Sequence, residues 1–229
     1  MERKYKILFK YPSRQRRERF LQGLDSILEN LHDQENFQIL VTADIDDPEM
    51  RDLPQYIIDH PRIRVQYGTS KSKIHAVNRD MEFADDDWDI VVVMSDDFRI
   101  IFDGFDEVVR GQYKEHGLDT LLHIPDQDAK NLLATMYIAG KDFYNRFGYI
   151  YHPQFLSVWC DNLVQDIAQL LGKYVYFDCT GLILHLNPAY GHLERDEMFN
   201  EQQGHWEHDE KLYREIRERG YDLHLINTK

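Results

Sequence analysis

The sequence predicts an α/β fold with a mainly parallel central sheet flanked by helices. Strand-like segments alternate with segments in which apolar residues recur at helical spacing, which is typical of parallel strands joined by crossover helices. The strands predicted in the first half cover residues 5–9, 37–41, 63–67 and 89–94. The last of these is almost entirely apolar, so we expect it at the centre of the sheet, buried on both faces.

Local signals predict the turns and helices between these strands. Pro12 and Ser13 form a turn after the first strand, with Ser13 as a possible N-cap of the following helix. The apolar residues of that helix are Phe20, Leu21, Leu24, Ile27, Leu28 and Leu31. Residues 68–70 form the turn into a second helix, because apolar residues again follow at helical spacing. They are Ile74, Val77 and Met81.

The second half of the chain has a less regular pattern. Its predicted strands cover residues 121–124, 132–138, 174–177 and 182–184. An amphipathic helix is expected from Trp159 to Gly172, and a single last helix ends at Gly220. The apolar face of this last helix carries Phe199, Trp206, Tyr213 and Ile216. Since no repeat or linker interrupts the pattern, we expect one domain over residues 1–229.

The composition excludes several classes of protein. A chain of 229 residues with 42% hydrophobic and 13% aromatic residues can bury a substantial core, which argues against disorder. No apolar run approaches the ~18 residues of a membrane span, and the first ten residues do not resemble a signal peptide. Two cysteines, Cys160 and Cys179, make no disulfide framework, so a cytoplasmic location is expected.

The net charge of −14 disfavours nucleic acid and anionic membranes as partners. A local exception is a basic cluster at Lys10, Arg14, Arg16, Arg17 and Arg19. This cluster is either a solvated first helical turn or a local anion site, and it leaves nucleic acid as an unfavoured alternative rather than an excluded one.

Polar residues follow each of the four strands predicted in the first half. They occupy residues 13–14, 44–47, 70–73 and 95–97. Because the carboxyl ends of parallel strands share one edge of a sheet, where α/β proteins bind their ligands, we expect a binding site there.

Two adjacent acids, Asp96 and Asp97, follow the apolar fourth strand directly. Mg²⁺ and Mn²⁺ prefer such oxygen ligands and are bound by one or two carboxylates together with substrate phosphates. A metal at this position would neutralise charge on a leaving diphosphate. The acidic run at residues 85–87 lies at the opposite end of the strand and is expected to be a solvated loop.

The Met-Ser-Asp-Asp stretch at residues 94–97 resembles the metal-binding signature of GT-A fold glycosyltransferases of the family 2 type. In that family, an Asp-x-Asp or Asp-Asp sequence at a strand end holds the metal and the nucleotide diphosphate. Ser95 stands in place of the first acid of Asp-x-Asp. The resemblance therefore implies Asp97 as the direct metal ligand, with Asp96 facing the sugar or ribose.

The resemblance extends to residues that would bind the nucleotide. Ser13 and Arg14 match in type the Ser or Thr and the Arg that the family carries after its first strand. After the second strand the family has an Asp that reads the base. Asp44, Asp46 and Asp47 are candidates, of which Asp46 is favoured by its distance from the strand.

After the third strand, Lys73 and Asn78 are similar to a Lys…Ala-x-Asn pattern that faces the nucleotide in the family. The resemblance thus implies a GT-A (Rossmann-like) fold, with a nucleotide-sugar-binding half at residues 1–100 and an acceptor-binding half at residues 101–229.

The second half offers candidates for the general base and for a further metal ligand. Inverting family members place an Asp at the start of a helix, where it takes the proton of the acceptor hydroxyl. Asp161 matches this position, with Asp166 as the second choice. Some enzymes of this fold recruit a C-terminal His to the metal. His185, at the end of a predicted strand, is the favoured candidate over His192.

These features together predict a metal-dependent inverting glycosyltransferase that uses Mn²⁺ or Mg²⁺. It would move a sugar from a nucleotide-diphosphate donor, with UDP preferred, to a hydroxyl of a glycan or another acceptor. One alternative is a nucleotidyltransferase, although the glycine-rich loop usual after its first strand is missing from residues 9–14. The other is a non-catalytic nucleotide-sugar-binding domain. Residues 202–206 are also similar to the Gln-x-x-Arg-Trp signature of processive synthases, with His205 in place of Arg.

Overall fold

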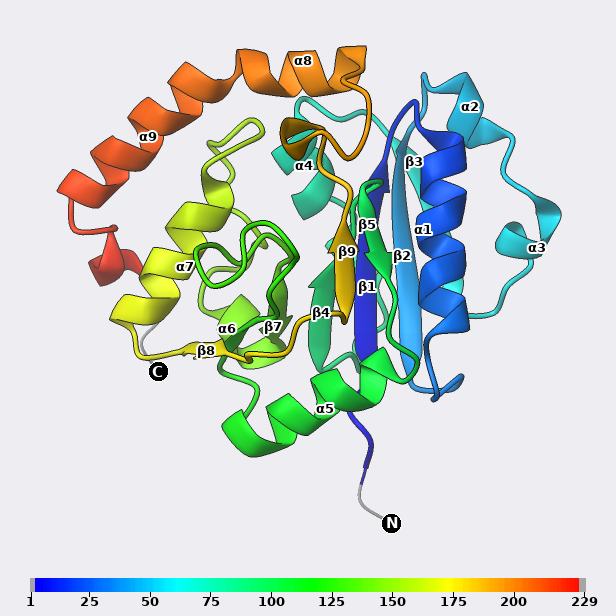
Figure 1. Cartoon of the computed structure of the whole chain (residues 1–229), viewed down its shortest axis with the longest axis horizontal. Coiled ribbons are helices and arrows are strands. Elements are labelled where there is room, and N and C mark those ends of the chain that lie inside the picture. The colour runs from blue at the N-terminus through cyan, green and yellow to red at the C-terminus, as the bar shows by residue number, and fades with distance from the viewer. Residues whose placement is uncertain (1–2, 227–229) are drawn as a thin grey trace.

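The computed structural model describes residues 3–226, and seven strands within them form one sheet in the order β3-β2-β1-β4-β7-β6-β8 (Figure 1). The strands are β1 (Ile7–Ser13), β2 (Phe37–Asp44), β3 (Ile63–Gly68), β4 (Ile90–Val93), β6 (Leu121–His123), β7 (Ile138–Gly140) and β8 (Tyr174–Tyr176). The first four run parallel to one another, and β7 runs antiparallel to both β4 and β6. The α/β class and the mainly parallel sheet are confirmed.

Strand β4 has the central position that its apolar sequence predicts. All four of its residues are buried, because it lies between β1 and β7 with packed helices on both faces. The parallel register with β1 pairs Ile7 with Ile90 and Lys10 with Val93. The chain therefore leaves β4 at the same edge of the sheet at which β1 ends.

One face of the sheet is covered by α1 (Arg17–Glu29), α5 (Phe105–His116) and a two-stranded sheet of β5 (Phe98–Ile100) and β9 (Ile183–His185). These elements contribute Phe20, Leu24, Phe105, Val109 and Ile183 to one hydrophobic cluster. The short helices α2 (Pro48–Arg51) and α3 (Gln55–Ile58) lie in the connection between β2 and β3. In Figure 1, β5 and β9 lie in front of β1 and β4.

The opposite face is covered by α4 (Lys73–Asn78), α6 (Lys141–Asn145), α7 (Cys160–Leu170) and α9 (Trp206–Glu218). Their buried residues form a second cluster that includes Ile74, Phe143, Leu163, Ile167 and Ile216. Helix α8 (Glu197–Gly204) precedes α9, and the 3-10 turns are η1 (Met81–Phe83), η2 (Pro188–Tyr190) and η3 (Leu223–Leu225). None of the helices between residues 3 and 226 is long and apolar enough to cross a membrane.

The structure corrects three predictions of secondary structure. Residues 132–137 form a loop rather than a strand, because the Leu132 carbonyl and the Ala134 N–H bond to the Gln165 side chain on α7 instead of a neighbouring strand. The single last helix is two helices that meet at His205, just after the weak helix former Gly204. Ser13 is the last residue of β1, and Arg16 occupies the N-cap of α1.

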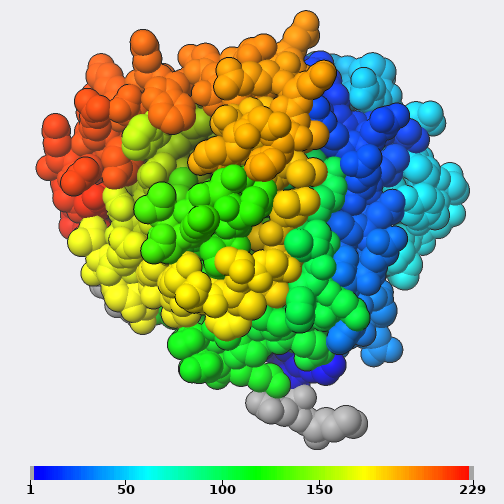
Figure 2. Space-filling model, viewed as in Figure 1, coloured from blue at the N-terminus to red at the C-terminus, as the bar shows by residue number. Residues whose placement is uncertain are grey.

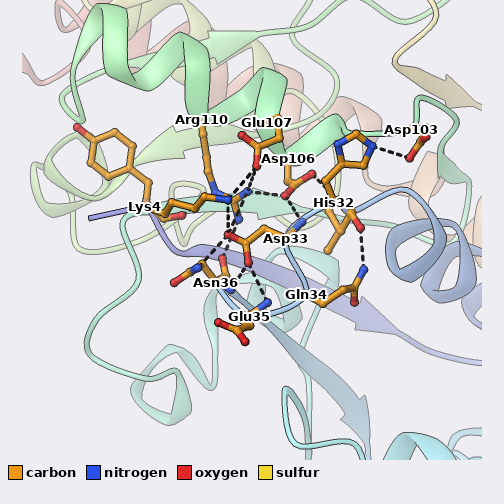
Figure 3. A network of polar contacts seen from close by, with 12 residues as sticks. Lys4, His32, Asp33, Gln34, Glu35, Asn36, Asp103, Asp106, Glu107 and Arg110 are labelled. Carbon is orange, nitrogen blue, oxygen red and sulfur yellow. Dashed lines mark hydrogen bonds and ion pairs between the residues drawn. The ribbon is translucent and has the colours of Figure 1, made fainter. Parts of the chain in front are cut away.

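A network of polar contacts lies at the amino-terminal end of the parallel strands, opposite the end at which Asp96 and Asp97 follow β4 (Figure 3). Asp106, at the start of α5, accepts the backbone N–H groups of His32 and Asp33 at 2.9 and 3.0 Å. Asp106 also pairs with Arg110, whose Nη2 donates to the Asn36 carbonyl at 3.0 Å. This network ties α5 to the loop before β2, at the end of the sheet away from the polar strand ends.

Candidate active site

A pocket opens at the carboxyl edge of the sheet, where β1, β2 and β4 end. The first half of the chain lines it with Pro12, Ser13, Arg14, Arg16, Thr42, Asp44, residues 70–73, Ala76, Ser95, Asp96 and Asp97. The second half contributes Leu156, Ser157, Met198, Glu201, Gln202 and His205. All four polar segments predicted for this edge therefore supply residues to one pocket.

Asp96 faces this pocket from a buried position beside the end of β1. It is 8% exposed and accepts a hydrogen bond from the Ser13 hydroxyl at 2.8 Å. Burial raises the pKa of Asp96 to about 7, although the Ser13 hydrogen bond and the charge of Arg16 act in the opposite direction. The structure thus brings together two residues that the sequence assigned to the nucleotide sugar.

Asp97 lies next to His185, as the pairing of β5 with β9 requires. Phe98 and His185 are register partners and their rings stack at 4.2 Å, which places His185 Nε2 3.5 Å from Asp97 Oδ2. Burial would raise the pKa of Asp97, but the hydrogen bond from His185, with the charges of His185 and Lys73, lowers it well below its usual range. Asp97 is therefore an anion at neutral pH.

His185 is held from behind by a second carboxylate, that of Asp126. The distance from His185 Nδ1 to Asp126 Oδ2 is 2.9 Å, and Asp126 also accepts from Thr135 at 2.8 Å and from the Ala129 N–H at 2.6 Å. Burial would lower the pKa of His185, but Asp126 and Asp97 together raise it to about 9. At neutral pH both ring nitrogens of His185 therefore carry protons, with Nδ1 facing Asp126 and Nε2 facing Asp97, and Nε2 would give up its proton on binding a metal.

This donor set fits a divalent cation. A metal-ligating His commonly donates its other N–H to a carboxylate, as His185 can to Asp126, and Mn²⁺ or Mg²⁺ needs few protein ligands when phosphates complete its shell. Within residues 3–226, no group of three or more His, Cys, Asp and Glu side chains gathers in a metal-binding arrangement. Asp97 and His185 could hold a metal as a pair of ligands, with a bound diphosphate to complete its shell.

The end of β2 presents Asp44, rather than Asp46, to the pocket. Asp44 is 4% exposed, accepts from Arg14 Nη1 at 2.6 Å and lies 3.5 Å from Arg79 Nη2. Asp46 has a 65% exposed side chain, pairs with Arg14 Nη2 at 3.3 Å and is outside the pocket wall. Strand β2 runs on to Asp44 itself, beyond the predicted strand end at residue 41, so Asp46 lies only two residues past the strand.

Lys73 and Asn78 occupy the two ends of α4 and have different surroundings. Lys73 begins the helix and lines the pocket, where its charge acts on Asp97 and Asp161. Asn78 donates to the Tyr151 carbonyl at 2.6 Å and accepts the N–H groups of Ile150 and Tyr151 at 3.0 Å. Its amide is therefore engaged with the backbone of residues 150–151, outside the pocket wall.

Asp161 lies in the first turn of α7, half-buried, and its Oδ1 accepts the Asn162 N–H at 2.9 Å. Burial raises the pKa of Asp161, although the hydrogen bond from the Asn162 N–H and the charges of Lys73 and His185 act to lower it. It is not among the residues that line the pocket, but the charges of Lys73 and His185 reach it. Asp166 faces α9 and the C-terminal turn instead, where it accepts the hydroxyls of Tyr213 and Tyr221.

The residues of the basic cluster have different surroundings: one is buried in the core, and others line the pocket or pair with the C-terminal half. Lys10 is fully buried and bonds to Thr42, and burial lowers its pKa to about 7. Arg16 lines the pocket and holds Asp196, the N-cap of α8, through Nε at 2.9 Å and Nη2 at 2.5 Å. Figure 2 shows the orange segment near α8 lying against the blue N-terminal elements.

His192, the second choice for a metal ligand, pairs with Asp128, with its Nε2 2.8 Å from Asp128 Oδ2. Sequence reasoning did not single out Asp126, and it placed Arg16 only within a general basic cluster. Asp126 is an isolated acid in an irregular segment, so no periodicity marks it. Arg16 could have been found from its position three residues past the end of β1.

This arrangement of strands, acid pair and pocket defines a GT-A glycosyltransferase fold. Solved structures of two such proteins are similar to the chain. Staphylococcus aureus TarS, residues 1–349, matches with a TM-score of 0.62 and 13% identity over 79% of this chain and 60% of that one. Mannosyltransferase PcManGT from Pyrobaculum calidifontis, in complex with GDP-Man and Mn²⁺, matches with a TM-score of 0.65 and 14% identity over 83% and 59%.

A third match is TarS 1–349 in complex with UDP-GlcNAc, with a TM-score of 0.64 and 13% identity over 84% of this chain and 60% of that one. The chain therefore spans less than two thirds of these structures. No protein-family model and no curated protein sequence matches it. The predicted GT-A fold is confirmed by structure alone, without detectable sequence relatives in those two comparisons.

Proposed function

We propose that this protein is a metal-dependent inverting glycosyltransferase that uses a nucleotide-diphosphate sugar, with UDP as the preferred nucleotide. The observation that carries the proposal is the pairing of Asp97 with His185 beside Asp96, at a pocket that also contains Arg16 and Lys73. Anionic ligands for a divalent cation and cations for a diphosphate thus meet at the strand ends. The complexes of similar structures with UDP-GlcNAc, and with GDP-Man and Mn²⁺, support a donor of this class.

Each half of the chain has a part in this proposal. Asp44, held by Arg14, would read the base, while Ser13 and Asp96 would contact the ribose or the sugar. Arg16 and Lys73 would contact the diphosphate, and Asp97 and His185 would hold the metal. The metal, when bound, would neutralise charge that develops on the leaving diphosphate.

The proposed base is Asp161. Its carboxylate takes the proton of the acceptor hydroxyl as that oxygen attacks the anomeric carbon, and the bond to the nucleoside diphosphate breaks. A single displacement inverts the anomeric centre, so an α-linked donor gives a β-linked product. Proton NMR of the first product tests this step, because a small anomeric coupling from a gluco-configured donor would indicate retention.

The central test is nucleotide binding by calorimetry, with and without Mn²⁺. The wild-type protein is expected to bind UDP, or GDP, more tightly with Mn²⁺, and Asp97→Asn is expected to lose this increment while remaining folded. Asp86→Asn makes the same chemical change at an exposed site at the other end of β4 and serves as the control. An unchanged Mn²⁺ increment in Asp97→Asn would contradict the metal assignment. A separate screen that measures release of nucleoside diphosphate from different nucleotide sugars would identify the donor.

A further inference from the structure

Residues 156–158, here called the strap, lie shortly before Asp161 and contribute Leu156 and Ser157 to the pocket wall. The fully buried carboxylate of Asp209, on α9, fixes the strap from behind. It accepts all three backbone N–H groups of the strap, from Leu156 at 3.0 Å, Ser157 at 2.8 Å and Val158 at 2.9 Å. The Leu156 carbonyl accepts the Ile74 N–H at 3.2 Å, which ties the strap to α4.

Ser157 is 3% exposed and lines the pocket, and its Oγ has no hydrogen-bond partner among the described residues. Four buried side chains within residues 3–226 keep such an unpaired polar atom, and Ser157 is the one that lines the pocket. A buried hydroxyl without a hydrogen-bond partner is energetically unfavourable, so such a group in a folded protein calls for an explanation, such as a bound ligand that supplies the missing partner. Because Asp209 uses every N–H of the strap, the Ser157 hydroxyl is the donor that the strap can still offer.

The position of Ser157 in the chain indicates which part of a ligand it meets. Ser13, Arg14 and Asp44 line the side of the pocket proposed to bind the nucleotide, and Asp161, the proposed base, lies in the first turn of α7, three residues after the strap. The group between a bound diphosphate and the base is the sugar to be transferred. Building on the proposed function, we propose that Ser157 hydrogen-bonds a hydroxyl of the donor's sugar and so helps to select it, with Asp209 as its positioning residue.

The test compares each nucleotide sugar with its nucleoside diphosphate, using UDP-GlcNAc with UDP and GDP-mannose with GDP, in Mn²⁺ and without acceptor. Ser157→Ala is expected to bind the nucleoside diphosphate as wild type does and to bind the nucleotide sugar about 3- to 10-fold more weakly, the effect of one net hydrogen bond. Ser26→Ala is the matched control, since Ser26 is a buried serine of α1 outside the pocket wall whose Oγ donates to the Gly23 carbonyl at 2.7 Å. Its ratio of nucleotide-sugar to nucleotide affinity is expected to stay that of wild type.

Two further readouts separate this role from a structural one. Because the Ser157 hydroxyl makes no hydrogen bond to any residue between 3 and 226, the melting temperature of Ser157→Ala should not fall, whereas a structural serine would lower it. Donor analogues that lack single sugar hydroxyls complete a double-mutant cycle. One analogue should bind wild type about 3- to 10-fold more weakly than the parent donor and bind Ser157→Ala equally well.

The outcomes distinguish the inference from the function on which it rests. If wild type binds a nucleotide sugar and Ser157→Ala binds it equally well, the inference fails while the proposed function stands. A variant that loses only acceptor binding also overturns it, because the contact would then be with the acceptor. If wild type binds neither nucleotide sugars nor nucleoside diphosphates, the proposed function and the inference fail together.

Discussion

The Arg16–Asp196 contact should control how firmly α8 covers the pocket. Asp196 caps α8 by accepting the Phe199 N–H at 2.9 Å, and it pairs with Arg16 and, at 3.1 Å, with Arg19. Asp196→Ala removes the cap and the ion pairs together. Asp196→Asn keeps a good capping oxygen and loses only the charge, so the two variants separate the two contributions.

The magnitude follows from the burial of the pair. The Arg16 side chain is 11% exposed and that of Asp196 is 31%, which places the pair between exposed ion pairs and fully buried ones. We therefore assign about 1–2 kcal/mol to the ion pairs and about 1 kcal/mol to the cap. The Ala variant should open α8 about 2–3 kcal/mol more easily, which is roughly a 30- to 150-fold faster amide exchange.

Hydrogen-exchange mass spectrometry of residues 197–204 is the direct assay. Exchange should rise in the order wild type, Asp196→Asn and Asp196→Ala, while the central strand β4 stays protected in all three proteins. Equal protection of α8 in wild type and Asp196→Ala would refute the reasoning. Equal exchange in the two variants would assign the whole effect to the ion pairs rather than to the cap.

Three further predictions concern single groups. Asp161→Asn should keep nucleotide binding and lose transfer about 10²-fold or more, and normal turnover in this variant would exclude Asp161 as the base. Since burial raises the pKa of Asp161, the wild-type kcat should fall as the pH is lowered through that raised pKa. Asp126→Asn should weaken Mn²⁺ binding roughly 10- to 100-fold in calorimetry with metal-free UDP affinity unchanged, and an unaltered Mn²⁺ affinity would contradict the role of Asp126 behind His185. Lys10 has a pKa of about 7 in the folded protein against 10.5 in the unfolded chain, so unfolded protein binds more protons between these pH values. Urea denaturation should therefore show the free energy of unfolding rising with pH in wild type relative to Lys10→Met, and parallel pH profiles would be contrary evidence.

The first half of the fold could be predicted because its elements are long and strongly patterned. The burial of these elements is visible in the local sequence. Strand β4 is buried on both faces and reads as an apolar run, and α1 is buried on one face and shows apolar residues at helical spacing. The second half depends on three-residue strands such as β6 and β9, which are too short for periodicity to define. Apolar residues at 132–138 suggested a strand, yet Leu132 is 77% exposed in a loop.

The candidate site was predictable where it depends on strand ends and hidden where it depends on packing. Asp96 and Asp97 are marked by the strand that precedes them, and His185 by its position at a strand end. Asp126 and Asp209 carry no such mark, because each acts through contacts with residues distant in the sequence. Their roles appear only when the loop at residues 126–129 and helix α9 are packed in place.

The order in which this chain is synthesised has a consequence for when its pocket can exist. The strands that carry the acid pair are made early, but Arg16 pairs with a residue 180 positions later, and the Leu156 N–H bonds to Asp209 53 positions later. A nascent chain that has released only its first half exposes Asp96 and Asp97 without His185 or the cover of α8. Premature termination before α9 would thus yield a chain with all seven strands of the sheet but without Asp209, so protease sensitivity of such a fragment should concentrate at the strap.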